Sequence, residues 1–279
     1  MAARKPNTRP LAKFSGRLVL LGAGKMGAAM LDGWLARGLD PRKLIVLESK
    51  PAKAVKALTR RGVKLNPKQA SEASAIVIAV KPQIAPDALP TLAPYAGKRT
   101  LALSIMAGRP LHFLAGALPA GLGIVRAMPN TPAAIGRGIT VAVPNAKVSA
   151  SQRKLAGDLL AATGGVEWVK DEALMDAVTA VSGSGPAYVF LLAEAMTQAG
   201  IAAGLPAALA ARLARETVAG SGELLHRSEL DAATLRQNVT SPGGTTAAAL
   251  AVLMGPGGFD SLLTKAIAAA TQRSCELAG

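Results

Sequence analysis

Residues 17–27 read RLVLLGAGKMG, an apolar run that leads directly into a glycine-rich turn. The run has the composition of a buried strand, and residues 26–37 carry apolar side chains at helical spacing. A GxGxxG pattern between a strand and a helix is typical of a dinucleotide-binding turn, where a pyrophosphate lies on the free amides of the helix. Gly22 would permit the tight turn, Gly24 the approach of the pyrophosphate, and Gly27 the close packing of helix on strand. The stretch therefore predicts the first unit of a Rossmann-type fold.

Apolar runs of the same character recur along the chain up to residue 169. They alternate with amphipathic stretches, as expected for strands of a parallel sheet that helices cover on both faces. We therefore predict an α/β protein whose N-terminal domain, residues 17–169, is a doubly wound sheet that binds a dinucleotide. The predicted strands are 17–21, 44–47, 75–80, 100–105 and 124–128, with edge strands at 138–143 and 166–169, and the predicted helices are 26–37, 52–61 and 151–162.

Residues 170–279 have a different texture, with Ala, Leu, Glu and Arg at helical spacing, and they predict an all-helical C-terminal domain. The stretch 187–199 carries only Glu194 and Gln198 as strongly polar groups. A helix of that kind must be buried over most of its surface. Because one such domain is too thin to bury several apolar helices, we predict a homodimer that forms through this helical half, with a higher oligomer of such dimers as the alternative. The predicted helices are 171–181, which the SGSGP sequence at 182–186 ends, and 187–203, 207–225, 232–239, 246–254 and 258–277.

The composition limits the classes of partner. The net charge is +15, but Lys and Arg are scattered and only 3% of residues are aromatic, so a nucleic-acid partner is not expected. No apolar run is long enough to span a bilayer and no secretion signal is evident, which argues against a membrane partner and against export. The single cysteine, Cys275, fits a reducing, cytoplasmic setting. Residues 1–16 are basic, lack acidic side chains and predict a disordered basic tail, with an organelle transit peptide as the alternative.

Polar and small residues follow several predicted strands, at the carboxyl edge of the sheet where ligands bind in such folds. Glu48 ends the second strand, where a carboxylate commonly bonds the ribose 2′-hydroxyl of NAD. Lys50, with help from Ser49, would instead suit the 2′-phosphate of NADP, so the sequence leaves the cofactor preference open. The loops after later strands would bring the backbone close to a flat ring, and they are Val80-Lys81-Pro82, Met106-Ala107-Gly108 and residues 128–132, in which Asn130 and Thr131 offer uncharged hydrogen-bonding groups.

Two glycine-rich segments precede helices in the second half. SGSGP at 182–186 places a proline in the first helical turn. TSPGGTT at 240–246 offers several hydroxyls and unpaired backbone amides at a helix start, a group that suits a carboxylate. Physical reasoning alone leaves open whether either segment binds a ligand or only caps its helix.

Five segments, taken in order, resemble those of the pyrroline-5-carboxylate reductases, over roughly residues 17–277. They are GAGKMG at 22–27, AVKP at 79–82, MPNTP at 128–132, DAVTAVSGSGPAY at 176–188 and TSPGGTT at 240–246. The resemblance implies an N-terminal dinucleotide domain and a C-terminal helical domain that intertwines with its twin. It also implies reduction of 1-pyrroline-5-carboxylate, a small imino acid, to L-proline with NADPH or NADH, the last step of proline synthesis.

The resemblance also assigns site residues. Two positions depart from the family pattern: Glu48 stands where many NADP-preferring members have a small polar residue, and Gln69 stands near where relatives place an asparagine against the adenosine ribose. The substrate carboxylate and ring nitrogen would be held, partly from the neighbouring subunit, by Ser241, Gly243, Gly244, Thr245 and Thr246. The cofactor would be lined by Gly22, Ala23, Gly24, Lys25, Met26, Gly27, Val80, Lys81, Pro82, Met106, Ala107 and Gly108.

The implied chemistry asks little of ionisable side chains, because a protonated cyclic imine is already electrophilic. We expect the Thr246 hydroxyl to hydrogen-bond the ring nitrogen while its loop presents the ring to the nicotinamide. The rival β-hydroxyacid dehydrogenases need a general base, usually a lysine of the helical domain, and no lysine lies between Lys170 and Lys265. A ketol-acid reductoisomerase would need clustered carboxylates for Mg²⁺, whereas Asp176 and Glu194 are isolated, so no metal is expected. A dinucleotide-binding protein that has lost turnover is the remaining alternative.

Overall fold

The computed structural model describes residues 9–278, which fall into two compact units. Unit 1 runs up to Gly183 and includes the chain from Thr271 onwards, and unit 2 is Ser184–Ala270. The boundary between the units follows Gly183 and not residue 169, where the composition changes. The segment between these two positions packs within unit 1. The assignment of a nucleotide domain to 17–169 and of a substrate domain to 170–279 stays a prediction.

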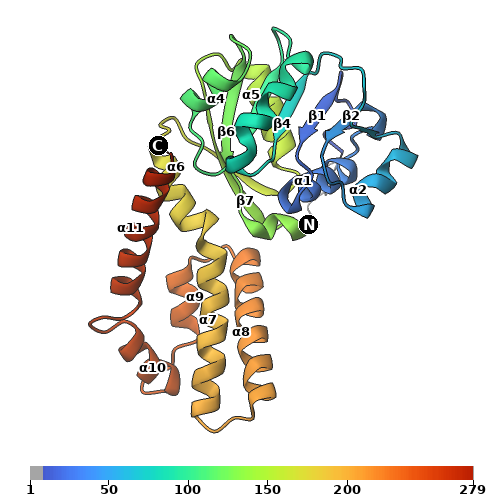
Figure 1. Cartoon of the computed structure of the whole chain (residues 1–279). Helices are drawn as coiled ribbons and strands as arrows, with labels where there is room; N and C mark the ends of the chain where they lie inside the picture. The colour runs from blue at the N-terminus through green and yellow to red at the C-terminus, as the bar shows by residue number, and fades with distance from the viewer. Residues whose placement is uncertain (1–8, 279) are drawn as a thin grey trace. The chain divides into compact units, whose positions relative to one another are not determined.

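Unit 1 is built on an eight-stranded sheet with the order β3-β2-β1-β4-β5-β6-β7-β8 (Figure 1). Neighbouring strands are parallel except β6 and β7, which are antiparallel. The chain begins in the middle of the sheet at β1 and winds outward to both sides, which confirms the predicted doubly wound, Rossmann-type sheet. The strands are β1 (Leu18–Leu21), β2 (Leu44–Leu47), β3 (Lys64–Leu65), β4 (Ala75–Ile78), β5 (Leu101–Ser104), β6 (Gly123–Met128), β7 (Gly138–Pro144) and β8 (Gly164–Trp168).

Alternate side chains of the strands enter two apolar cores, one on each face of the sheet. Leu18 and Leu20 of β1 lie in the core that helices α1 and α5 cover, whereas Val19 and Leu21 lie in the core covered by α3, α4 and the 3-10 turn η4. Burial on both faces explains why these strands are continuous apolar runs in the sequence. The helices and turns are α1 (Lys25–Ala36), η1 (Pro41–Lys43), α2 (Lys53–Ala57), η2 (Leu58–Arg61), η3 (Pro82–Ile84), α3 (Ala85–Ala88), η4 (Leu89–Tyr95), α4 (Leu111–Ala117), η5 (Thr131–Ile135), α5 (Ala150–Leu160) and α6 (Leu174–Val178).

The sequence does not predict β3, α3, η4 or α4. Strand β3 contains two residues, too few for a recognisable pattern. Prolines Pro86, Pro90 and Pro94 fall within α3 and η4 and remove backbone donors, so this segment forms short turns rather than one helix. The predicted helix at 52–61 is the short α2 followed by the 3-10 turn η2.

Residues 9–16 belong to the folded part of unit 1, so the prediction of a disordered tail is wrong for this stretch. Leu11 and Phe14 are buried in the core beneath α1. The backbone amide of Leu11 donates to the carbonyl oxygen of Arg37 at 3.2 Å. The two apolar side chains stabilise the segment against the core, an effect that its charge pattern does not reveal. Residues 1–8 of the predicted tail lie outside the described residues.

The SGSGP segment does not end the helix that precedes it, contrary to the prediction. After α6 the backbone continues through a π-helical turn, Thr179–Gly183. Ser184 then keeps helical dihedral angles, φ −84° and ψ −24°, at the start of α7 (Gly185–Ala202). Pro186 does not interrupt the helical course of the backbone, because it lies in the first turn of α7, where an amide would have no intrahelical partner.

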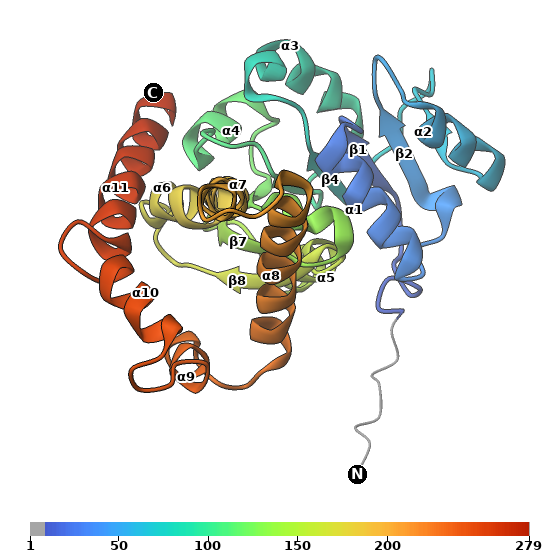
Figure 2. The ribbon, with the colours of Figure 1, turned by 90° about the horizontal axis from the view of Figure 1, so that it is seen from below.

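Unit 2 consists of helices, and α7 and α8 pack side by side (Figure 1 and Figure 2). A Cβ atom at Gly200 would lie 3.2 Å from the Cβ of Ala210, so glycine keeps this contact close. Large apolar side chains of unit 2 are exposed, notably Phe190 (63%), Leu191 (62%) and Val252 (76%). A single chain therefore leaves bare the apolar surface that its composition predicts to be buried. The other helices are α8 (Ala207–Arg227), α9 (Ala232–Asn238), α10 (Thr245–Leu253) and α11 (Phe259–Ala278), the last of which ends in unit 1.

None of the helices among the described residues is both long enough and apolar enough to cross a bilayer. The longest, α8, carries many charged side chains along its 21 residues.

Candidate active site

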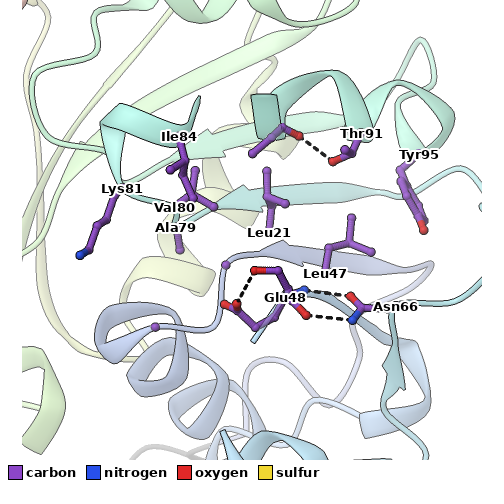
Figure 3. A pocket seen from close by; sticks show the side chains of 14 residues that line it. Leu21, Leu47, Glu48, Asn66, Ala79, Val80, Lys81, Ile84, Thr91 and Tyr95 are labelled. Carbon is purple, nitrogen blue, oxygen red and sulfur yellow. Dashed lines mark hydrogen bonds between the residues drawn. The ribbon is translucent and has the colours of Figure 1, made fainter. Parts of the chain in front are cut away.

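A cleft of about 610 Å³ opens in unit 1 at the carboxyl ends of β1, β2 and β4 (Figure 3). It lies where the chain switches from one side of β1 to the other, which is the position at which doubly wound sheets bind ligands. Apolar side chains and backbone form most of its wall. Its lining includes Gly22, Gly24, Glu48, Ser49, Asn66, Val80 and Lys81.

The glycine turn forms one wall of the cleft. Gly22 has φ +91°, and a Cβ atom there would lie 2.8 Å from the carbonyl oxygen of Ala79. A Cβ at Gly27 would lie 2.2 Å from the Gly22 carbonyl oxygen, so only glycine lets α1 approach this closely. A Cβ at Gly24 would meet nothing within 4 Å, which leaves open space for a ligand. Gly24 is the N-cap of α1 and no described side chain caps this helix, so its first amides are free to bind an anion.

Glu48 lies at the end of β2 and is held from two directions. Its Oε2 accepts a hydrogen bond from the Ala23 amide at 2.8 Å, and its Oε1 accepts one from the Lys50 amide at 2.9 Å. Its backbone N–H and C=O both pair with the side-chain amide of Asn66, at 2.9 and 2.8 Å (Figure 3). The carboxylate is therefore fixed beside the glycine turn. The Lys50 side chain is exposed and is not part of the cleft lining.

Asn66 lines the cleft, although no motif of the sequence singles it out. Among the described residues it is the one non-glycine residue with a positive φ, 45°, a conformation that asparagine tolerates better than most residues. Its backbone amide donates to the Val46 carbonyl oxygen at 2.9 Å and so fixes it beside β2. Gln69, which the family resemblance places near the adenosine ribose, is exposed and does not line the cleft. Asn66 lies directly after β3. Because β3 is too short to recognise in the sequence, nothing in the sequence places Asn66 at the cleft.

The loop after β4 forms the opposite wall. Val80 and Lys81 line the cleft, and Pro82 begins the turn η3. The guanidinium of Arg109 donates to the Pro82 carbonyl oxygen at 3.2 Å and lies over the ring of Phe113 at 4.6 Å. A residue that follows β5 thus supports the loop that follows β4.

The predicted cofactor residues that follow β5 and β6 are outside the lining of this cleft. The lining also omits several predicted residues of the walls described above, namely Ala23, Lys25, Met26, Gly27, Lys50 and Pro82. Met106 is buried, and its amide donates to the Ser104 hydroxyl at 3.3 Å. The Asn130 side-chain oxygen accepts from the Ile139 amide at 2.9 Å and ties η5 to the start of β7. Asn130 therefore has a structural partner, and its contact with a cofactor stays a prediction.

In unit 2, residues 240–246 form a turn that leads into α10. The Gly244 amide donates to the Ser241 carbonyl oxygen at 3.1 Å, and Gly244 is the N-cap of the helix. Within unit 2 no side chain caps α10, so the amides of its first turn remain available to an anion. These amides belong to Thr245, Thr246 and Ala247.

The chain matches known proteins along nearly its whole length. Residues 172–277 match the family model described as pyrroline-5-carboxylate reductase dimerisation, and residues 17–108 match one described as NADP oxidoreductase, coenzyme F420-dependent. A pyrroline-5-carboxylate reductase from Pseudomonas aeruginosa is 41% identical over 265 residues, which cover 94% of this chain and 97% of the relative. A solved structure of the reductase from Coxiella burnetii has a TM-score of 0.87 and 33% identity, covering 95% of this chain and 100% of that one. A pyrroline carboxylate reductase from Plasmodium falciparum, solved with NADP bound, has a TM-score of 0.77 and 29% identity, covering 95% and 99%.

Proposed function

The chain belongs to the pyrroline-5-carboxylate reductase family, and on that premise we propose how its residues carry out the reaction. It is an oxidoreductase that reduces 1-pyrroline-5-carboxylate to L-proline with NADPH or NADH, the last step of proline biosynthesis. It forms a homodimer through its helical half. The observation that carries this conclusion is the match to a reductase over 94% of the chain, which includes both the nucleotide cleft and the helical unit.

The residues of the cleft fit a nicotinamide dinucleotide. The free amides at the start of α1 suit its pyrophosphate, and the open space beside Gly24 admits it. Glu48 presents acceptors for a ribose hydroxyl. The reduced cofactor, when bound, supplies the hydride. We assign its binding to residues 22–27, to Glu48, Ser49 and Lys50, to Val80, Lys81 and Pro82, and to Met106, Ala107, Gly108 and Asn130 at the later strand ends.

The turn before α10 is assigned to the substrate carboxylate. Unpaired amides at a helix N-terminus carry partial positive charge, which favours an anion. Thr246 lies in this first turn and is half-buried, so its hydroxyl is placed near any group that the amides bind. The residues assigned to the substrate are Ser241, Gly243, Gly244, Thr245 and Thr246.

The reaction balances without an ionisable base. A hydride adds to C5 of the protonated imine, the C=N π electrons become the nitrogen lone pair, and the nitrogen keeps its proton. In our proposal the Thr246 hydroxyl accepts a hydrogen bond from that N–H and so orients the ring. Fixing the carboxylate and the nitrogen leaves the ring one orientation, and alignment of this kind accounts for much of an enzyme's rate.

The assay that tests the function follows the oxidation of NADH and NADPH by the purified chain. With pyrroline-5-carboxylate we expect cofactor oxidation and formation of an equal amount of proline. With 3-hydroxyacids and oxidised cofactor we expect no reduction of the cofactor, which separates this enzyme from the β-hydroxyacid dehydrogenases. Proline formation that stays at the level of an enzyme-free control would contradict the assignment.

We also propose a cytoplasmic setting. The support is Cys275, which is a free and exposed thiol in the described structure. Exposed thiols persist as thiols in reducing compartments. Fractionation of the native cells tests this proposal, and recovery of the enzyme with the cytoplasmic fraction is the expected result.

A further inference from the structure

We propose that Glu48 makes NADH the preferred cofactor, because its carboxylate is fixed where NADH carries a ribose 2′-hydroxyl and NADPH carries a phosphate. The inference rests on the proposed function and names the cofactor that the cleft of unit 1 selects. The sequence alone leaves this choice open between Glu48 and Lys50. In the structure Glu48 contributes its carboxylate to the cleft, whereas the Lys50 side chain lies outside the cleft lining.

The carboxylate of Glu48 is held by backbone rather than by mobile side chains. Oε2 accepts from the Ala23 amide at 2.8 Å and Oε1 from the Lys50 amide at 2.9 Å. The Ser49 hydroxyl lies at 3.5 Å from Oε1. Because the Ala23 amide belongs to the glycine turn, the carboxylate is anchored to the same turn that would hold the pyrophosphate.

The backbone of Glu48 is fixed as well. Both of its polar backbone groups pair with the side chain of Asn66 (Figure 3). The backbone amide of Asn66 in turn donates to the carbonyl oxygen of Val46 in β2. Glu48 thus has its main chain and its side chain tied to separate elements of unit 1. Moving this charge out of the cleft would break several hydrogen bonds at once, so the site cannot easily adapt to an anionic ligand.

The two cofactors differ chemically at one place, the adenosine 2′ position. A carboxylate has two oxygens with about four acceptor sites, so it can accept from a ribose hydroxyl beyond the amides that already hold it. A 2′-phosphate offers acceptors and carries a charge of about −1.5 to −2. A 2′-phosphate beside the fixed carboxylate of Glu48 would bring two negative charges close together, and their repulsion disfavours binding.

Lys50 does not offset this charge within the cleft. It contributes its backbone amide to Glu48, and its ammonium group is on an exposed side chain outside the cleft lining. Exposed basic side chains also occur on the neighbouring α2 and η2, among them Lys53, Lys56 and Arg60. These side chains are exposed, so solvent and salt screen their attraction for either cofactor, and they do not neutralise the fixed carboxylate of Glu48.

The test measures binding of two adenosine fragments to the full-length dimer by calorimetry. ADP-ribose carries the 2′-hydroxyl, and 2′-phospho-ADP-ribose carries the phosphate. We expect the wild type to bind ADP-ribose at least about tenfold more tightly. In Glu48→Gln, which keeps the size and one acceptor of the side chain, this ratio should fall by about tenfold or more. Higher salt should narrow the wild-type ratio, because the repulsion is partly screened.

A matched control is Glu167→Gln, which removes the same charge from an exposed position on β8. This variant should keep the wild-type ratio. Glu48→Ser provides a second variant in case Glu48→Gln fails to fold. The proposal is overturned if the wild type binds the 2′-phosphate fragment as tightly as ADP-ribose, or if both Glu48 variants keep the wild-type ratio.

Steady-state kinetics with pyrroline-5-carboxylate gives an independent readout. We expect kcat/KM for NADH to exceed that for NADPH in the wild type, and the order to reverse or level in Glu48→Gln. Failure to reduce pyrroline-5-carboxylate with either cofactor would contradict the proposed function itself. Reduction with NADPH preferred would overturn only the role of Glu48.

Discussion

The hydroxyl of Ser274 donates a hydrogen bond of 2.6 Å to the carboxylate of Asp176, and so joins the last helix of the chain to α6. Ser274 is buried, and the thiol of Cys275 lies at 3.4 Å from the other oxygen of the same carboxylate. Asp176 opens the DAVTAVSGSGPAY segment, which continues into the first turn of α7. A residue of this segment therefore secures the end of α11 within unit 1.

Removing the Ser274 hydroxyl should destabilise the protein. A hydrogen bond to a charged group contributes about 1.5–3 kcal/mol, and Ser274→Ala also leaves the Asp176 oxygen without this donor. We expect the free energy of unfolding to fall by about 2 kcal/mol in urea denaturation of the dimer. Ser221→Ala, at an exposed position on α8, should change it by less than about 0.5 kcal/mol. Equal effects of the two changes would show that the Ser274 bond contributes nothing specific.

The reactivity of Cys275 tests whether the Asp176 carboxylate raises the pKa of the neighbouring thiol. The hydrogen bond to Asp176 is the largest of the influences that raise the pKa of the Cys275 thiol above its ordinary value, followed by burial. A raised pKa means less thiolate at a given pH, so alkylation should be slow near about pH 8 although the residue is exposed. Asp176→Asn should lower this pKa and shift the alkylation profile toward lower pH. Mass spectrometry of iodoacetamide-treated protein measures the alkylation rates. Identical pH profiles for the wild type and Asp176→Asn would refute the role of Asp176.

Two glycines of the nucleotide turn should respond differently to a methyl group. Gly27→Ala places a Cβ within 2.2 Å of a carbonyl oxygen and should cost about 1–3 kcal/mol of stability. Gly24→Ala meets no protein atom within 4 Å, so it should spare stability and instead weaken cofactor binding by occupying the space of the pyrophosphate. Thermal unfolding and calorimetric titration with NADH separate the two effects. A Gly24→Ala variant with wild-type affinity would contradict the placement of the pyrophosphate.

The hydroxyl of Thr246 should matter for turnover more than for binding. Thr246→Ala removes the group that we propose orients the ring nitrogen, and we expect kcat to fall by about 100-fold because the ring loses its alignment. Thr246→Ser keeps a hydroxyl and should stay within a few-fold of the wild type. Because the amides of α10 are unchanged, KM should move little in either variant. If Thr246→Ala turns over at the wild-type rate, the hydroxyl has no part in the reaction.

Charges on the exposed apolar surface of unit 2 should break the dimer. Phe190 and Leu191 are more than half exposed in one chain, and a buried unpaired carboxylate at either position would be costly. We expect Phe190→Glu and Leu191→Glu to give monomers in sedimentation experiments. Ile135→Glu makes the same change at an exposed position of unit 1 and should leave a dimer. Dimeric Phe190→Glu and Leu191→Glu proteins would place the interface elsewhere.

Much of the fold could be predicted because local patterns and tertiary structure agree. Strands β1, β2 and β4 are buried on both faces, so each is a continuous apolar run. GAGKMG marks a turn where the backbone requires glycine. The helices of unit 2 begin and end close to the expected residues, since proline and glycine punctuate them. Elements that depend on few residues, such as β3, or on prolines within short turns, such as η4, carry no such pattern.

The site could be predicted only where a motif coincides with a backbone requirement. The glycine turn, Glu48 and Lys81 line the cleft as expected for strand ends. Asn66 escapes prediction because its role depends on a positive φ and on pairing with Glu48, neither of which has a sequence signature. The bond between Asp176 and Ser274 joins residues almost a hundred positions apart, and local patterns do not report such pairs.

A crystal structure of the dimer with L-proline and NADH bound tests the central claim most directly. The distances to measure are those from the proline carboxylate to the amides of Thr245, Thr246 and Ala247, and from the ring nitrogen to the Thr246 hydroxyl. We predict hydrogen bonds of about 2.7–3.2 Å at these positions, with C5 of the ring facing the nicotinamide. A carboxylate bound instead by Lys or Arg side chains, with residues 240–246 away from the ligand, would contradict the account.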